Sequence, residues 1–244
     1  MNKFNDGENL SIIISSYLGF KERLNILEKV VENLRKYFPK SEIIVLFDKL
    51  GVDSVKGVNK CITHQNGLGY SWNHGIEIAK NNYILQTEDD WEIKNFINKD
   101  TIDKLITQSF ELLNDDKVEC IRMDAAMFDK IGGSICYPLG YQKLEHNNIE
   151  YWIYNIPTEE DVKKNGWLKY YFCNHPHLKL KSKVNSFKYI ENEKPNIVET
   201  DACKQWRDNK WNCGYVDLIN NKDKRYFYHK GGKFSYAKIN PSVP

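Results

Sequence analysis

The chain has 244 residues, of which 41% are hydrophobic and 28% are charged, and its formal net charge is +2. This length is enough for one large α/β domain or two small ones with a sizeable buried core, and the composition is ordinary for a soluble globular protein. A net charge so close to zero gives no electrostatic reason to expect nucleic acid or a membrane surface as a partner.

The sequence carries no signal for secretion or membrane insertion. No apolar run approaches the roughly 18 residues that a membrane-spanning helix requires, and residues 1–9 lack the apolar segment of a signal peptide. The 6 cysteines include no C-x-x-C pair, which argues against a zinc site, and a disulfide framework is not expected at this length. We therefore expect a soluble, cytoplasmic protein with reduced thiols, no integral membrane segment and a flexible N-terminus at 1–9. Peripheral attachment to a membrane stays open.

The first part of the chain alternates between strand and helix patterns. β-branched runs are typical of strands buried on both faces, and apolar residues at helical spacing lie between them. Strands are expected at 10–16, 42–47, 60–63 and 83–85, and helices at 21–38 and 71–80. This alternation predicts an α/β fold with a Rossmann-like, mainly parallel central sheet flanked by helices.

The pattern continues with a helix over 101–113 and a strand over 118–123 that completes the predicted sheet. Beyond residue 123 the sequence is less regular and rich in aromatic residues. Candidate strands there lie at 151–154, 168–172, 213–218 and 225–229, and a candidate helix lies at 197–209. No repeat or proline- and glycine-rich linker divides the chain, so we expect a single domain over 1–244.

Three consecutive acidic residues follow the strand at 83–85. Glu88, Asp89 and Asp90 repel one another at a strand end unless a cation or a donor-rich ligand lies among them. Carboxylate oxygens suit a hard cation such as Mg²⁺ or Mn²⁺, which in turn suits phosphate. A solvated acidic turn is the alternative interpretation.

Other chemistry-bearing residues also follow strands of the predicted sheet. Ser16 and Tyr17 follow the first strand and Asp48 follows the second. Ligands of parallel sheets bind beyond the carboxyl ends of the strands, so these residues and the acidic cluster are expected at one edge. Gly67 and Gly69 permit a tight turn and a close approach of backbone to a ligand.

The order of these stretches resembles the GT-A glycosyltransferases, especially the inverting enzymes of family 2. Segment 10–17 is similar to the family's first strand, and segment 83–91 resembles its strand and D-x-D-type motif. Gly67, Asn73 and Gly75 match its N-x-G-x(5)-N-x-G pattern, in which Gln65 replaces the first Asn. Later stretches also correspond: an acidic pair at 198–201, a helix and returning strand at 205–207 and 214–216, and a C-terminal His segment at 229–233.

This resemblance implies a metal-dependent inverting glycosyltransferase of the hexosyltransferase type. It would move a sugar from a nucleotide-diphosphate sugar donor to a hydroxyl group of a glycan or another acceptor, with Mn²⁺ or Mg²⁺ as cofactor. Residues 10–123 would bind the nucleotide sugar, and residues 124–244 would bind the acceptor and carry the catalytic base.

The resemblance also assigns roles to individual residues. Asp90 is the expected metal ligand, and His229 would complete the metal or diphosphate site. Asp201 is the expected general base, with Glu199 as the second candidate. The expected substrate-binding residues are Ser16, Tyr17, Asp48, Gly67, Asn73, Glu88, Asp89 and Trp91.

Structural interpretations compete with several of these roles. Glu199 and Asp201 also fit an acid-rich first helical turn, stabilised by the helix dipole. His229 also fits a packed residue at a strand end. His175 and His177 flank a proline and suit a loop better than a metal site, since no third ligand is evident. Trp91, beside the acidic motif, is the candidate for stacking on a sugar. Core packing is the alternative for the other candidate tryptophans, Trp152, Trp167, Trp206 and Trp211.

Two other functions remain open at this stage. The same fold could hold a nucleotide or glycan without turnover, as a binding module. A sugar-phosphate nucleotidyltransferase shares a related α/β core, but residues 17–20 are Tyr-Leu-Gly-Phe rather than the glycine-rich G-x-G-T-R loop of such enzymes.

Overall fold

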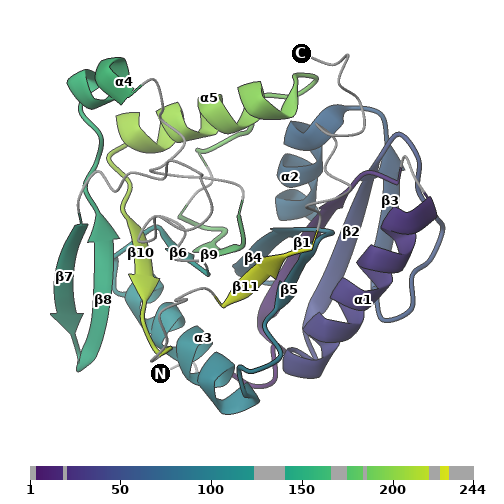
Figure 1. Cartoon of the computed structure of the whole chain (residues 1–244), viewed down its shortest axis with the longest axis horizontal. Coiled ribbons are helices and arrows are strands. Elements are labelled where there is room, and N and C mark those ends of the chain that lie inside the picture. The colour runs from purple at the N-terminus through teal and green to yellow at the C-terminus, as the bar shows by residue number, and fades with distance from the viewer. Residues whose placement is uncertain are drawn as a thin grey trace.

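The computed structural model describes residues 4–18, 21–123, 141–165, 175–183, 186–219 and 226–230. Its strands form a nine-stranded sheet and a small two-stranded sheet, and helices cover both faces of the large sheet (Figure 1). The predicted strand at 168–172 and Trp167 lie outside the described residues.

The large sheet has its strands in an order that differs from their order along the chain. Across the sheet they are β3 (Lys60–His64), β2 (Glu42–Asp48), β1 (Leu10–Ser16), β4 (Tyr83–Glu88), β9 (His177–Leu180), β6 (Cys120–Arg122), β10 (Cys213–Val216), β8 (Ile149–Tyr154) and β7 (Tyr141–His146). The small sheet pairs β11 (Phe227–His229) with β5 (Trp91–Ile93). The helices are α1 (Lys21–Tyr37), α2 (Gly67–Ile78), α3 (Lys99–Asn114), α4 (Glu159–Asn165) and α5 (Pro195–Asp208).

Most strands of the large sheet run in one direction. β3, β2, β1 and β4 are parallel neighbours, and β6 and β10 are also parallel. Within this sheet of described strands, only β9 and β8 run the other way, because each is antiparallel to both of its neighbours. The expected α/β fold with a mainly parallel central sheet is therefore confirmed.

Alternation along β1 and β2 produces the two faces of the sheet. Ile12 and Ile14 pack with the apolar side of α1 and with α3 in one core. Ile13 and its neighbours Ile44 and Leu46 pack on the other face, in a core that includes side chains of α2 and α5. Strands covered on both faces in this way are continuous apolar runs, which is why the sequence identified them.

The centre of the sheet differs from the prediction. The strand predicted at 118–123 is present as β6, but it does not pair with β4, because β9 lies between them and pairs with both. β10, β8 and β7 then extend the sheet beyond β6. The strands β5, β7 and β9 and the helix α4 had not been predicted.

Two local expectations are corrected. Helix α2 begins at Gly67 rather than at Ser71, so Gly67 and Gly69 belong to its first turn. The described part of the N-terminus, residues 4–9, is anchored, since the ring of Phe4 packs against Phe38 and Phe110 at 5.9 and 6.2 Å. No helix in the described ranges combines the length and the apolar character that crossing a membrane demands.

Candidate functional site

A cavity of about 760 Å³ lies at the carboxyl ends of β1, β2 and β4. It is lined by Ser15, Ser16, Tyr17, Arg23, Asp48, Lys49, Gln65, Gly67, Leu68, Glu88, Asp89, Asp90, Asn192, Glu193, Lys194, Pro195, Asn196 and His229. Eight of the predicted site residues are in this lining: Ser16, Tyr17, Asp48, Gly67, Glu88, Asp89, Asp90 and His229. The edge of the sheet predicted from the strand order is therefore where these side chains meet.

Asp89 is fully buried and connects α1 with the end of β1 beneath the cavity. Its Oδ2 accepts a hydrogen bond of 2.6 Å from the hydroxyl of Ser16 at the end of β1. Its Oδ1 accepts from the guanidinium of Arg23, and its backbone N–H donates to the carbonyl of Ser15 at 3.2 Å. Burial raises the pKa of Asp89 to about 6, although the charge of Arg23 and the bond from Ser16 act against this rise. Asp89 thus ties helix α1 to the end of β1.

Only one of the two carboxylate oxygens of Asp90 has a hydrogen-bond partner among the described residues. Its Oδ2 accepts from Nη1 of Arg23 and lies 3.0 Å from Nε2 of His229. Its Oδ1 is buried and has no hydrogen-bond partner among the described residues. Burial raises the pKa of Asp90, but the bond with His229 and the charge of Arg23 outweigh burial, so this pKa lies below its ordinary value. Asp90 is therefore an ionised acceptor on the wall of the cavity.

An orphaned, ionised carboxylate oxygen fits a divalent cation. Asp90 and His229 lie together, as the sequence predicted, but the nitrogen of His229 is directed at Asp90 Oδ2. Within the described ranges, no third His, Cys, Asp or Glu joins them in a three-residue group with metal-ligand spacing. Mg²⁺ and related ions are commonly held by one or two carboxylates, with substrate phosphates completing the coordination. The residues present fit that arrangement.

Glu88 differs from the two aspartates beside it. It is partly exposed at the end of β4 and lines the cavity. Burial, with the charges of Asp90 and Glu199, raises the pKa of Glu88 to about 8. Glu88 therefore holds a proton more readily than Asp90, and in its protonated form it can donate a hydrogen bond to a ligand.

The other end of the cavity is formed around Asp48. Its Oδ1 accepts a 3.3 Å hydrogen bond from the backbone N–H of Gly67, which has a φ of +76° at the start of α2. The ammonium group of Lys49 lies 5.8 Å from the centre of the Tyr17 ring. An aromatic face, a cation and a carboxylate are thus grouped at the ends of β1 and β2, whereas Asp90 follows β4, on the other side of β1.

Asn73 does not line the cavity. Its side-chain amide donates to the carbonyl of Tyr189 and accepts from the N–H of Tyr189, at 2.8 and 2.9 Å. One turn earlier, a Cβ on Gly69 would lie 1.9 Å from the carbonyl oxygen of Ile190. Asn73 and Gly69, which the sequence pattern associated with ligand binding, instead hold segment 189–191 against α2. This segment leads into the cavity-lining residues 192–196.

Trp91 is buried, with 6% of its surface exposed. The ring of His175 lies 4.8 Å from its ring and the ring of His229 lies 5.1 Å from it. The expectation that Trp91 stacks on a sugar is therefore corrected: imidazoles occupy its surroundings, and it supports His229 beside Asp90. Trp206 is fully buried in a core, as its structural interpretation required.

His175 and His177 do not form a pair of ligands. His177 belongs to β9 and is 1% exposed, and its Nδ1 lies 2.8 Å from the carbonyl oxygen of His175. The imidazole of His175 packs on Trp91 instead. The metal interpretation of this motif is therefore not supported by its geometry.

The two candidate bases lie on helix α5 but face different directions. Residues two positions apart on an α-helix point about 200° apart, so only one of them can face the cavity. Asp201 accepts a 2.6 Å hydrogen bond from Gln205 on its own helix. The charge of Glu199 raises the pKa of Glu88, which places Glu199 near the acidic cluster.

Sequence reasoning missed Arg23, Lys49 and segment 192–196. Arg23 carries a detectable signal, because a cation in the first turn of a helix opposes the helix dipole and so needs a local anionic partner. Lys49 has a φ of +75°, which no sequence pattern reveals. Segment 192–196 reaches the site through contacts across more than a hundred residues, which the sequence alone does not show.

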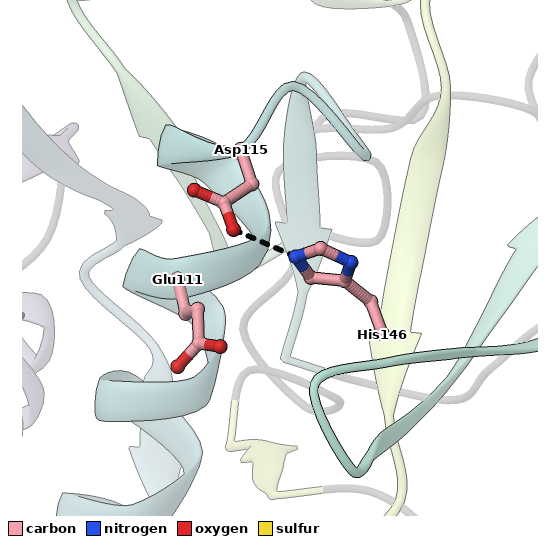
Figure 2. Close-up of side chains that lie close together, drawn as sticks. All are labelled: Glu111, Asp115 and His146. Carbon is pink, nitrogen blue, oxygen red and sulfur yellow. Dashed lines mark hydrogen bonds and ion pairs between the residues drawn. The ribbon is translucent and has the colours of Figure 1, made fainter.

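A second cluster of potential ligands lies elsewhere. Figure 2 shows Glu111 in the last turn of α3 and Asp115 just after the end of that helix, with His146 from the β7–β8 hairpin facing Asp115. Nε2 of His146 lies 2.6 Å from Oδ2 of Asp115. Next to Asp115, Asn114 bonds at 2.6 Å to the hydroxyl of Tyr83, at the start of β4. This cluster is therefore at the opposite edge of the sheet from Asp90, and its hydrogen bonds account for its geometry.

Comparison with solved structures finds the same fold in S. aureus TarS. In the TarS 1–349 complex with UDP-GlcNAc the TM-score is 0.51 at 12% identity, over 93% of this chain and 62% of that one. The TarS 1–349 complex with UDP gives 0.54 at 13%, over 90% and 60%, and a longer TarS structure gives 0.57 at 10%, over 91% and 36%.

The fold is accordingly a GT-A-like glycosyltransferase fold, as the resemblance implied. The chain spans less than two thirds of the length of each TarS chain compared. No family model and no curated protein matches the sequence.

Proposed function

We propose that this protein is a glycosyltransferase that uses a nucleotide-diphosphate sugar as donor. The fold supports this class, and one observation supports the site: Asp90 lines a cavity at the strand ends, and its buried Oδ1 has no hydrogen-bond partner among the described residues. Ligands in parallel α/β sheets bind at this edge. A cavity of about 760 Å³ is also in the range that encloses a ligand of nucleotide-sugar size.

The cavity has a distinct end for each part of such a donor. The Tyr17 ring and Lys49, with Asp48 beside them, suit a nucleobase, which offers a flat face and hydrogen-bonding edges. Glu88, in the same lining, can hydrogen-bond to a ribose hydroxyl. Asp89 has both oxygens engaged by Ser16 and Arg23, so its main contribution is to hold the wall in place.

The diphosphate belongs at the Asp90 end. Asp90 would hold Mn²⁺ or Mg²⁺ through Oδ1, with His229 and Arg23 fixing the carboxylate through Oδ2. A bound divalent ion would neutralise the negative charge that develops on the departing diphosphate. Arg23 lines the cavity beside Asp90 and adds a permanent positive charge there.

An acidic residue of α5 would take the proton from the acceptor hydroxyl. The sequence favours Asp201, and Glu199 is the second candidate, because its charge acts on Glu88 in the cavity lining while Asp201 accepts a hydrogen bond from Gln205 on its own helix. A base on the face opposite the leaving group gives a single displacement with inversion at the anomeric carbon. We further propose that residues 1–244 act as one domain, with donor binding in 10–123 and the acceptor side in 124–244.

A thermal-shift screen of nucleoside diphosphates tests this function. UDP is the first candidate, because the TarS structures were obtained with UDP-GlcNAc and UDP. A ligand that binds the native state raises its melting temperature. We expect one nucleoside diphosphate to raise the melting temperature, more so with Mn²⁺, and we expect this effect to be lost in Asp90→Asn. The control Asp100→Asn, which changes an exposed aspartate, should behave as wild type.

Turnover separates an enzyme from a binding module. Release of free sugar from UDP-sugars with Mn²⁺, lost in Asp90→Asn and in Glu199→Gln, would support the transferase. Stabilisation by a diphosphate without turnover on any acceptor would favour a binding module. If no nucleoside diphosphate stabilises the wild type, the proposed function is wrong.

A further inference from the structure

Arg23 is a cation built into the site. It stands in the first turn of α1, where the helix dipole disfavours positive charge, and only 13% of its side chain is exposed. Its guanidinium reaches both Asp89 and Asp90, one nitrogen for each carboxylate. Burial lowers the pKa of Arg23, but the charges of the two aspartates outweigh burial and raise it. The group is therefore permanently charged beside the cavity.

The contacts of Asp90 use only one of its two carboxylate oxygens among the described residues. Arg23 and His229 both bond to Oδ2 of Asp90, and the buried Oδ1 has no hydrogen-bond partner among the described residues. A divalent ion at Oδ1 would then share one carboxylate with the guanidinium. Two cations on one carboxylate repel each other, and the repulsion is strong where burial limits screening.

We propose that Arg23 couples the binding of the divalent cation to the binding of the diphosphate. Its charge weakens the affinity of the site for a bare cation and strengthens the affinity for a polyanion. The diphosphate, lying between both cations, removes their repulsion, so each ligand binds better in the presence of the other. This inference rests on the proposed function and assigns Arg23 as a positioning residue within it.

The charge argument makes two predictions of opposite sign. Arg23→Gln keeps a hydrogen-bond donor but removes the charge. Coulomb's law then predicts binding of Mn²⁺ alone that is about tenfold tighter and binding of UDP alone that is about tenfold weaker. The tenfold or greater mutual enhancement between Mn²⁺ and UDP expected in the wild type should shrink correspondingly.

Both affinities can be measured without turnover. Electron paramagnetic resonance of free Mn²⁺ gives the dissociation constant for the ion, and isothermal titration calorimetry with chelator gives that for UDP. Arg23→Lys, which restores the charge, should return both constants towards wild type. Arg207→Met, which removes a cation that pairs with Asp208 on α5, is the matched control and should change neither.

The outcomes separate this inference from the proposed function. Opposite shifts in Arg23→Gln, reversed in Arg23→Lys, support the coupling. Weakening of both ligands would indicate structural damage, and the absence of any shift would indicate that the charge has no role; either result overturns the inference while the wild type still binds UDP and Mn²⁺. A wild type that binds neither ligand overturns the proposed function as well.

Discussion

Replacing Lys179 with methionine is expected to stabilise the protein at neutral pH. Lys179 lies in β9 and is fully buried, between Ile84 of β4 and Cys120 of β6. Its ammonium group donates to Oε1 of Gln86 at 2.6 Å, and no carboxylate in the described ranges pairs with it. A lysine buried in this way costs free energy whenever it must be charged.

The size of the effect follows from the pKa. Burial lowers the pKa of Lys179 from 10.5 to about 7. At about 1.36 kcal/mol per pKa unit, this shift corresponds to about 5 kcal/mol of destabilisation when the group is charged in the unfolded chain. The aromatic rings of Phe187 and Tyr189, at 5.7 and 5.3 Å from the ammonium nitrogen, favour the charged form and make this figure an upper bound.

The sign determines the pH dependence. Between pH 7 and 10.5 the unfolded chain binds a proton at Lys179 that the folded protein has released, so stability rises with pH in this window. Methionine has no titratable group, and the hydroxyl of Tyr189 can still donate to Oε1 of Gln86 when the ammonium group of Lys179 is absent. The advantage of Lys179→Met should therefore be largest at pH 7 and below, and it should fall by about 2 kcal/mol between pH 7 and pH 9.

Urea unfolding at pH 7, 8 and 9 measures this difference directly. The exposed Lys188, changed to methionine, serves as the control and should differ from wild type by a constant amount. A variant at Lys179 that is less stable than wild type at pH 7 would refute the reasoning. An advantage that does not shrink as the pH rises would refute it equally.

Three further predictions concern the clamp on α2 and a buried acid; urea unfolding measures the stability of each variant, and calorimetry measures UDP binding. Gly69→Ala should destabilise by about 1–3 kcal/mol, because the new methyl group would meet the carbonyl of Ile190, a backbone atom that cannot move aside; wild-type stability would contradict the close approach. Asn73→Ala should cost about 1–3 kcal/mol by leaving buried polar groups of segment 189–191 unpaired, and it should also weaken UDP binding; unchanged UDP affinity would separate the clamp from the cavity. Burial raises the pKa of Glu42, but hydrogen bonds from Ser11 and Lys80 and the charge of Lys60 outweigh burial, so this pKa lies below its ordinary value. Its stabilisation is present above pH 4.5 and is lost as the pH falls through the folded-state value, so the advantage of wild type over Glu42→Gln should vanish in acid; an advantage that persists there would contradict it.

The sequence predicted the elements whose pattern is long and regular. The strands β1 and β2 and the helices α1 and α3 lie within about two residues of their predicted positions, because a period near 2.0 or 3.6 sustained over several residues identifies its structure. The short strand β9 was missed for a physical reason. It has only 4 residues, His-Leu-Lys-Leu, and the buried Lys179 gives it the polar character of a surface segment.

The site shows the same division. Order along the chain was enough to bring Glu88, Asp89 and Asp90 to the edge where Ser16 and Asp48 also lie. Which oxygen of Asp90 stays free depends on partners that no local pattern specifies, because they come from α1 and β11.

Misassigned roles arose where a motif has its partner far away in the chain. Asn73 matched a pattern associated with ligand binding, yet it bonds to Tyr189, which lies 116 residues away. Trp91 was adjacent to the acidic cluster in sequence but became enclosed by His175 and His229. The acidic residues at the strand ends line the cavity, whereas Asn73, chosen from a sequence pattern, and Trp91, chosen because it follows the acidic cluster, do not.

The position of β9 has a consequence for how the chain is made. β4 and β6 belong to the first half of the sequence, but the strand that joins them comes from residues 177–180. While the ribosome translates the segment between β4 and β9, the edge of β4 exposes unpaired backbone groups. It also exposes apolar residues that are buried in the folded protein, such as Leu85. The edge of β4 therefore stays unpaired and prone to aggregation until about residue 180 has left the ribosome. Slow translation between β4 and β9 should increase incorrect pairing of this edge.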